Sequence, residues 1–286
     1  MPLLNIIGNV NQIKNPNISY TVPFFAVGGI KETFVTGGVS YTMHSFVSGS
    51  GSFEILSGNV DAEVLIIGGG GAGLQGSSDA QRGTGGGGGD AFVTSIAFQE
   101  SQIYGTTSSY NAYVGGGGIQ TVGTASNFIK TYDFNYIPYN PTQYLADYGF
   151  AGAILAGGES GNGNPGGNGG RAGGGGSGGA GGSTTLNTGG NGGIGIAAPY
   201  YFGGPSGSYP ILVGGGGGGG SEGSNYFGSG SYGGGNGGDV TNNIGASGSA
   251  NTGGGGGGGY NQLGGPDYIG GNGGSGVIRI VYVTQP

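Results

Sequence analysis

Glycine runs decide how this chain folds, and the longest are GGGGGGG at residues 214–220 and again at 253–259, with GGGG at 173–176. Each glycine loses roughly 1–2 kcal/mol of backbone freedom on folding and has no side chain whose burial could offset that loss. An isolated tract therefore stays disordered. Many tracts side by side can instead form left-handed extended helices of three residues per turn, in which each interchain hydrogen bond returns about 1 kcal/mol. The glycine block, residues 157–276, is thus either a disordered linker or a packed bundle.

The overall composition favours the bundle. Disordered chains are usually rich in charge and poor in aromatic residues, whereas this chain has 18 Tyr, 12 Phe and only 7% charged residues. A collagen helix is excluded, because its strict Gly-X-Y period fails at GGNGG (166–170) and the chain has only 11 prolines.

Charge and cysteine content exclude several function classes. The net charge of −7 disfavours nucleic-acid binding, because too few Lys and Arg are present to displace counterions from phosphates. The absence of cysteine removes disulfides, thiolate nucleophiles and zinc ribbons. The first residues have no basic region followed by a long apolar core, and no run of eighteen apolar residues occurs. We therefore expect neither a secretory signal nor a membrane-spanning helix.

Strand-forming runs lie on both sides of the glycine block. They are Tyr41 to Val47, Ser52 to Leu56, Val64 to Ile67, Ala91 to Phe98, Tyr110 to Val114, Ala125 to Tyr132 and, after the block, Val277 to Val283. We expect the first two runs to form a hairpin across SGSG (48–51). We expect the last run to pair with the earlier sheet, which would hold both ends of the block in place.

The predicted fold class is therefore mainly β. It is a β-sandwich-like scaffold with a large inserted bundle of polyglycine-II helices and little or no α-helix. We expect an N-terminal arm or docking segment at residues 1–38 and a glycine-rich domain at 39–286. Within that domain the β scaffold comprises 39–156 and 277–283, and the polyglycine bundle occupies about 157–276.

No motif in the chain predicts catalysis. The stretch GGGGAG (68–73) matches the dinucleotide fingerprint G-x-G-x-x-G after a strand, but the glycines that follow it prevent the helix that the motif needs. His44, the only histidine, lies in a predicted strand, where a hydrogen-bonded structural role is expected. The 13 carboxylates are dispersed, without calcium-loop spacing. We therefore expect no catalytic residue, no cofactor and no metal site, and the chain is predicted not to be an enzyme.

Aromatic residues supply the candidate contact sites. Bulky rings cannot enter a close-packed glycine bundle, so the rings of the block should lie at turns or on its outside. There they either bind a receptor on rigid loops or pack between subunits. An aromatic loop between Tyr132 and Phe150 either covers the sandwich, forms a subunit contact or touches a partner. The candidate residues are Tyr200, Tyr201, Phe202, Tyr226 and Phe227, which we expect to form part of one exposed apical surface, and Tyr136, Tyr139 and Tyr144 of the aromatic loop.

A series of motifs in a fixed order resembles a known family. The motifs are SYTMHSF (40–46), GSF (51–53), VDAEVLIIGGGGAG (60–73), YVGGGG (113–118) and GGSGVIRI (273–280). The series resembles the glycine-rich domain of virion structural and tail-fibre proteins of marine phages, notably cyanophages, over about residues 38–283. More distantly, the chain is similar to the tail-fibre tip adhesins of T-even-like phages, which implies polyglycine helices bundled on a β scaffold.

The resemblance also implies a function. It points to a non-enzymatic virion structural protein, a tail-fibre or adhesin component that projects a rigid glycine-rich module for host-surface attachment. The alternative is a capsid or tail decoration protein, or an extracellular filament subunit, that binds only its own assembly. Implied partners are other virion proteins, a host cell-surface glycan or outer-membrane protein, and further copies of the chain, a trimer being one option. The implied location is the virion, after synthesis in the host cytoplasm without a signal peptide.

Overall fold

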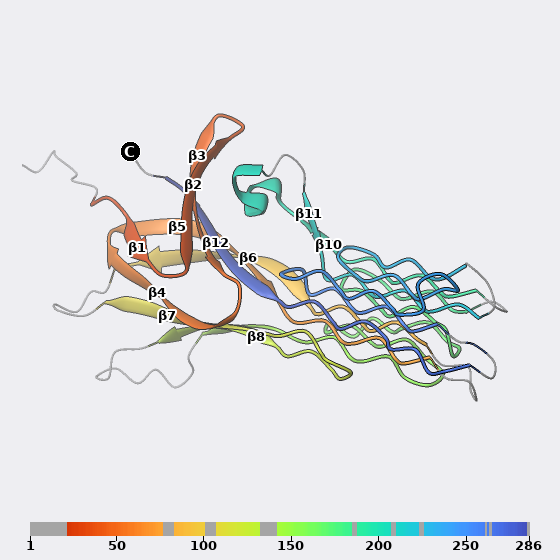
Figure 1. Ribbon diagram of the computed structural model, residues 1–286. Coiled ribbons are helices and arrows are strands. Elements are labelled where there is room, and N and C mark those ends of the chain that lie inside the picture. The colour runs from red at the N-terminus through yellow and green to blue at the C-terminus, as the bar shows by residue number, and fades with distance from the viewer. Residues whose placement is uncertain are drawn as a thin grey trace, which may run out of the picture.

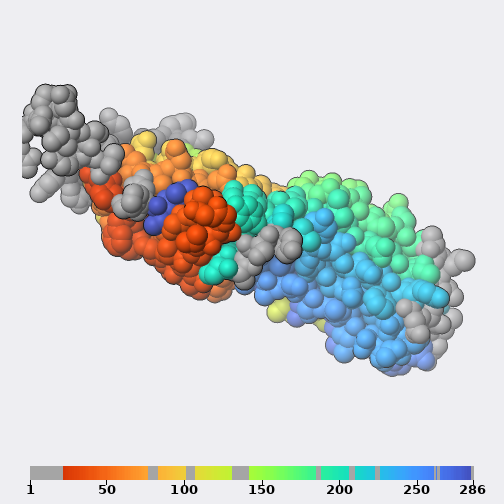
Figure 2. Space-filling view, turned by 90° about the horizontal axis from the view of Figure 1, so that it is seen from above, coloured from red at the N-terminus to blue at the C-terminus, as the bar shows by residue number. Residues whose placement is uncertain are grey.

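A computed structural model describes residues 22–76, 83–100, 107–131, 142–184, 188–206, 210–222, 226–260, 262 and 265–284. The molecule is elongated, with a β sandwich at one end and a bundle of extended glycine tracts at the other (Figures 1 and 2). Nearly all regular structure is β, and the described residues contain a single short 3-10 helix, η1 (Tyr200–Ser206). The expected fold class is confirmed.

The sandwich consists of two five-stranded antiparallel sheets with the orders β1-β4-β7-β8-β9 and β2-β3-β12-β5-β6. The strands of the first sheet are β1 (Phe25–Val27), β4 (Gly49–Ser57), β7 (Ser108–Val114), β8 (Ser126–Thr131) and β9 (Gln143–Ala146). Those of the second sheet are β2 (Ile30–Thr36), β3 (Val39–Phe46), β12 (Val277–Val283), β5 (Asn59–Ile67) and β6 (Ala91–Gln99).

Two expectations about the start of the scaffold are corrected. The predicted hairpin is wrong, because β3 pairs with β2 and β12 while β4 pairs with β1 and β7, in the other sheet. The short link between β3 and β4 thus crosses the sandwich. The expected arm does not extend to residue 38, because β1 and β2 belong to the two sheets. Residues 1–21 lie outside the described part of the chain.

The last strand lies in the middle of the second sheet. β12 pairs with β3 on one side, where Ile280 faces His44, and with β5 on the other, where Ile280 faces Val64. The prediction that Val277 to Val283 pairs with the earlier sheet is confirmed. Alternate side chains serve two cores: Ile278 and Ile280 point between the sheets, whereas Val277 and Val281 point to the outer face.

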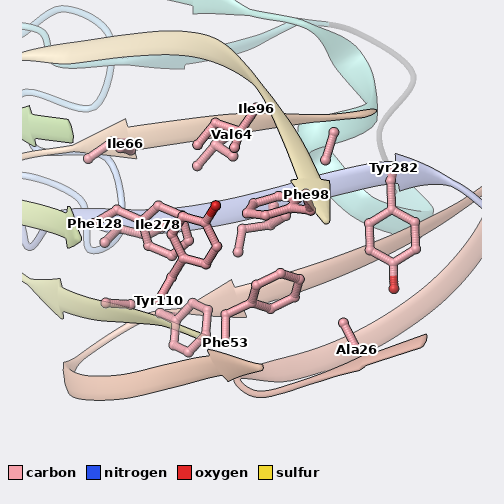
Figure 3. Packing of buried hydrophobic residues seen from close by; sticks show 14 of the residues in the cluster. Ala26, Phe53, Val64, Ile66, Ile96, Phe98, Tyr110, Phe128, Ile278 and Tyr282 are labelled. Carbon is pink, nitrogen blue, oxygen red and sulfur yellow. The ribbon is translucent and has the colours of Figure 1, made fainter. Parts of the chain in front are cut away.

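The main core fills the space between the sheets. Rings from both sheets meet there: Phe53 and Phe98 lie 5.0 Å apart between ring centroids, and Tyr110 stacks on Phe128 at 5.0 Å (Figure 3). Ile278 of β12 packs among them and is fully buried (Figure 3). Burying each of these large side chains contributes about 1.5–3 kcal/mol, so this core anchors the rest of the molecule.

A second core lies on the outer face of the second sheet. It is covered by η1 and by the small antiparallel pair β10 (Ile196–Ala198) and β11 (Ile211–Val213). Phe202 and Val213 pack there against Leu65 and Ile67 of β5. These covering elements come from within the glycine block, so the block is not a continuous bundle as the sequence predicted.

Hydrogen bonds of the glycine tracts repeat every third residue. In the tract 83–90, Gly85 and Gly88 donate to the carbonyls of Ala172 and Gly175, at 2.9 and 2.8 Å. The residues one position later in the tract donate to a second neighbouring tract, and those two positions later donate to a third. A three-residue repeat without bonds inside the tract is the geometry of the polyglycine-II helix.

Each central tract is surrounded by six others. The tract 83–90 donates hydrogen bonds to three neighbouring tracts and accepts hydrogen bonds from three others. Its successive residues point in three directions, and neighbouring tracts fill each of these directions. The donor-side neighbours are 172–175, 253–256 and 147–150, and the acceptor-side neighbours are 68–74, 158–161 and 217–220. No direction is left free for a side chain, which is why these tracts contain glycine at nearly every position.

Close approach, rather than unusual backbone angles, requires the glycines of the central runs. None of the residues 215–220 or 254–259 has a positive φ. A Cβ added at Gly217 would overlap the carbonyl oxygen of Gly256, and one added at Gly256 would overlap that of Gly271. Positive φ is found at Gly214 and Gly253, the first residues of the two runs, where the chain turns into the bundle.

Peripheral tracts carry one outward residue per turn. The motif Gly-Gly-Asn-Gly-Gly occurs four times, and its asparagines, Asn168, Asn191, Asn236 and Asn272, are all exposed. Two glycines of each turn face neighbouring tracts, while the third position faces solvent. Runs of pure glycine therefore identify the centre of the bundle and this motif identifies its edge.

The bundle begins earlier in the chain than expected. Tracts 68–76 and 83–90 connect β5 to β6 and lie at its centre, and 115–118 follows β7 directly. The expected start near residue 157 is therefore corrected, because the bundle tracts are continuations of the sandwich strands. The stretch 68–73 lies in one of these tracts, and the described residues after it, 74–76 and 83–90, do not form the helix that dinucleotide binding needs.

Candidate functional site

The rings expected on one apical surface lie in different places. Tyr200, Tyr201 and Phe202 belong to η1, which packs on the outer face of the second sheet (Figure 1). Phe202 is 0% exposed, so its expected exposure is wrong. The cause is the second core, which offers an apolar surface that a glycine tract could not cover.

Tyr201 packs over the scaffold together with Tyr41, whose ring stacks on it at 5.4 Å. Its hydroxyl donates a hydrogen bond to the carboxylate of Glu63, and Asp61 lies beside Glu63 at the rim of a hollow of about 250 Å³. Burial, and after it the bond to Glu63, raises the pKa of Tyr201. This environment keeps the tyrosine neutral and fixes η1 to the sheet.

The aromatic loop is only partly described. Tyr136 and Tyr139 lie outside the described residues. Tyr144 lies on β9, where it is half-buried and packs against the main core. This position agrees with the covering role, which was one of the three alternatives expected for the aromatic loop.

Tyr226 and Phe227 lie at the free end of the bundle. Tyr226 is 72% exposed and its carbonyl accepts a hydrogen bond from Gly189, in a peripheral tract. The run 253–259 starts beside Ile67 of β5 and rises about 3.1 Å per residue, so Tyr260 lies roughly 20 Å beyond the sheet. Phe227 is half-buried and lines a groove in this region, which we call the distal groove.

The distal groove has a volume of about 690 Å³, in the size range of small-ligand sites. Its walls combine two aromatic rings, amide side chains and one carboxylate. The lining residues are Phe227, Asn236, Gly237, Asp239, Thr241, Asn242, Asn243, Ile244, Gly245, Ala246 and Tyr268. Residues 226–260, in the blue part of the colour range, form much of the surface at this end of the molecule (Figure 2).

A tight turn builds one wall of the distal groove. Asp239 is only 7% exposed, and its carboxylate accepts hydrogen bonds from the backbone N–H groups of Thr241 and Asn242 at 2.8 and 2.6 Å. The backbone N–H of Asp239 donates to the carbonyl of Asn242 at 2.9 Å. Aspartate is suited to this position because its side chain can replace backbone partners within a turn.

Backbone hydrogen bonds to neighbouring segments hold the walls in place. Tyr260, at the end of the run 253–259, donates its backbone N–H to the carbonyl of Asn243 at 3.0 Å. Gly245 donates to Ile269 at 3.0 Å, and Ala246 donates to Asn236 at 2.8 Å. The groove is therefore built before any ligand arrives, which lowers the entropy cost of binding.

Tyr268, one of the two rings that line the groove, is held by contacts with its neighbours. Tyr268 packs against Tyr260, with ring centroids 5.8 Å apart, and its hydroxyl donates to the side-chain oxygen of Gln262 at 3.3 Å. Tyr260 is only 5% exposed, so it serves as a buried brace for Tyr268. Ile244, which lines the groove, is 60% exposed, and Ile269, whose carbonyl accepts a hydrogen bond from Gly245, is 50% exposed.

The groove carries little charge. Asp239 is the only acidic residue among the described residues that line the groove, and none of them is Lys, Arg or His. Within the described ranges, no group of three or more His, Asp or Glu could hold a metal ion. The surface therefore suits neutral ligands that combine apolar faces with hydrogen-bonding groups.

Sequence reasoning identified Phe227 but missed the turn at 239–243. The signal was the peptide DVTNN, a glycine-free segment rich in turn-forming residues between two glycine tracts. Tyr268 was not among the candidate residues, because its place in the same groove as Phe227 depends on which tracts are neighbours.

The fold and the groove define a class of protein: a β sandwich whose strands continue into a polyglycine bundle with a small groove near its free end. The chain belongs to the family described as glycine-rich domain, whose model matches residues 45–283. No curated protein matches the sequence. None of the helices in the described part of the chain is long and apolar enough to span a membrane.

Proposed function

We propose that this protein is a non-enzymatic structural protein of a phage virion, a tail-fibre or adhesin component that attaches the particle to its host surface. The observation that carries the proposal is the position of the distal groove, at the end of the bundle away from the β sandwich. The sequence resemblance to virion glycine-rich proteins supports the same function.

The bundle suits the role of a rigid spacer. Every central tract is bonded to six neighbours, so bending one tract would require breaking bonds to several others. A stiff spacer presents its end with little loss of conformational freedom when a receptor binds. The proposed receptor is a glycan or an outer-membrane protein of the host surface.

The scaffold end suits attachment to other virion proteins or to further copies of the chain. Exposed apolar side chains gather on the strands β1 and β2: Phe25 is 49% exposed, Ile30 56% and Val35 70%. Burial of such side chains is a common source of association energy. The proposal places the protein on the outside of the particle after synthesis in the host cytoplasm without a signal peptide. A homo-oligomer, such as a trimer, is part of the proposal, and nucleic acid is not a proposed partner.

The alternative is a decoration protein or filament subunit that binds only its own assembly. It is supported by apolar side chains on the flank of the bundle, where Ile119 is 72% exposed, Leu155 67% and Ile154 49%. In this alternative the flanks of neighbouring copies would cover these residues, and the distal groove would have no receptor.

Immunogold electron microscopy of virions with antibodies against this protein tests the proposal. We expect label at fibre tips, and we expect purified protein to compete with virions for adsorption to host cells. Label spread over the capsid or along a tube, without competition for adsorption, would favour the decoration protein and overturn the attachment role.

A further inference from the structure

We propose that the distal groove is a saccharide site that takes two or three sugar units of a neutral or N-acetylated glycan. The inference rests on the proposed attachment function and names the ligand class for the same groove. It is carried by the shape of the groove, by its two rings and by its uncharged hydrogen-bonding groups.

The size of the groove favours an oligosaccharide over a protein surface. Its volume of about 690 Å³ lies within the range of roughly 300–1,000 Å³ found for small-ligand sites. A stable protein interface needs a broad area, on the order of 800 Å² from each partner, and is usually much flatter than a groove. A short glycan chain can enter the groove and leave the rest of its polymer outside.

The rings supply apolar faces for stacking. Phe227 and Tyr268 come from separate segments, and both line the groove. One face of a pyranose ring carries mainly C–H groups, and such faces pack well on aromatic rings. Tyr260 braces Tyr268 from beneath, so the ring is oriented before the ligand binds.

Hydrogen-bonding groups line the same groove as these rings. Asn242 and Thr241 are exposed and Asn243 is half-buried, and the side chains of all three make no hydrogen bond to another described residue. An amide offers both a donor and an acceptor, which matches the pattern of sugar hydroxyls and of N-acetyl groups. The oxygen of the Asn236 amide accepts from Gly230 at 2.8 Å, which fixes this side chain at the rim with its NH₂ group available to donate.

Charge selects against acidic ligands. The lining contains the carboxylate of Asp239 and no basic side chain among the described residues, so a phosphate, sulfate or carboxylate would enter without a counterion. Exclusion of anionic sugars is therefore part of the proposal, and it separates this site from the basic grooves that bind sialic acid or sulfated chains.

The test uses saturation-transfer and chemical-shift NMR on the purified full chain. The probes are chitotriose, maltotriose and cellotriose as neutral sugars, with sialyllactose and a heparin disaccharide as anionic ones. We expect at least one neutral probe to bind and to shift the amides of Asn242, Asn243 and Tyr268, while the anionic probes do not bind. Absence of binding by every neutral probe, or stronger binding of an anionic one, overturns the proposal.

Matched variants place the binding in the groove. Phe227→Ser and the double variant Asn242→Ala/Asn243→Ala should each weaken the best probe at least about tenfold. Tyr226→Ser is the control, because Tyr226 is an exposed ring next to Phe227 in sequence that does not line the groove, and we expect less than about a twofold change. The asparagine variant keeps the proposal testable if Phe227→Ser fails to fold. Equal effects of Tyr226→Ser and Phe227→Ser would contradict it.

Adsorption assays separate this proposal from the attachment function. If virions with Phe227→Ser adsorb poorly and protease treatment of host cells abolishes wild-type adsorption, the receptor is a protein, so the saccharide proposal fails and attachment stands. If periodate treatment of the cell glycans abolishes adsorption instead, both are supported. If no groove variant affects adsorption, the attachment role fails as well.

Discussion

Both ring nitrogens of the buried His44 have a hydrogen-bond partner. It is 0% exposed, its Nδ1 lies 2.7 Å from the carbonyl of Gly28, and its Nε2 lies 3.1 Å from the hydroxyl of Tyr282. Because a carbonyl can only accept, Nδ1 carries the proton and Nε2 accepts from the tyrosine. The expected structural role of this histidine agrees with these contacts.

The environment of His44 predicts a pH dependence of stability. Burial lowers its pKa, the bond to Gly28 opposes that shift and the charge of Lys31 on β2 adds to it. The unfolded chain, with an ordinary histidine pKa near 6.5, therefore binds more protons than the folded protein below that pH. We expect the free energy of unfolding to fall as the pH drops from about 7 towards about 5, through the window below the unfolded pKa.

Urea unfolding at about pH 8 and about pH 5.5 measures this effect. In His44→Gln the difference between the two unfolding midpoints should shrink, because glutamine does not titrate. The comparison with wild type removes the contribution of the carboxylates, including Asp90, whose pKa is raised chiefly by burial. Equal pH dependence in the two proteins would refute the assignment.

At the level of elements, the position of a glycine tract determines how much change it tolerates. Central tracts have neighbours in all directions, whereas peripheral tracts expose every third residue. A substitution at a glycine without a positive φ can therefore destabilise the protein strongly in a central tract and have little effect in a peripheral one. Gly217 and Gly116 make a matched pair, since neither has a positive φ.

We predict that Gly217→Ala destabilises the protein by at least about 3 kcal/mol, because its Cβ would overlap backbone and separate tracts that share several hydrogen bonds. Gly217→Val should be worse still. Gly116→Ala should be neutral or stabilising by up to about 1 kcal/mol, because its Cβ meets only the Thr124 hydroxyl oxygen, at 3.8 Å. Thermal and urea unfolding compare the variants. Equal tolerance at the two sites would count against close packing of the bundle.

At the scale of the whole molecule, sandwich and bundle form one continuous structure. β5 continues directly into the tract that begins at Gly68, and the tract that ends at Asp90 continues into β6. In the same way, Gly276 leads into β12. Peptide hydrogen bonds thus continue from the sheets into the bundle without a linker. We expect the two parts to unfold together.

Hydrogen exchange measured by mass spectrometry tests this cooperativity. Amides of 214–220 and 253–259 should exchange about as slowly as those of β5 and β12, because opening a central tract breaks bonds to six neighbours. The peripheral segment 246–250, whose residues are mostly exposed, should exchange faster and provides the internal control. Exchange of the central runs at the rate of an unfolded peptide would show that the bundle is not a stable structure.

Local chemistry in the sequence was sufficient to predict β3 to β8 and β12, but not the strands β1, β2, β9, β10 and β11. Strand-forming residues in Val277 to Val283 and in the earlier runs predicted strands that pair into sheets. Long runs of glycine left a choice between disorder and a bundle of three-residue helices, and the low charge and many aromatic residues favoured the bundle. The place of β12 beside an earlier strand followed from the need of any strand for a hydrogen-bonded partner.

Only the tertiary structure decided which partners these elements have. Polyglycine tracts look alike in sequence, so nothing local distinguishes the neighbours of 83–90 from the other tracts. The crossing of β3 and β4 to separate sheets, the burial of Phe202 and the presence of Phe227 and Tyr268 in one groove all depend on contacts between residues far apart in the chain. The distal groove exists because of such contacts, whereas the bundle exists because glycine has no Cβ.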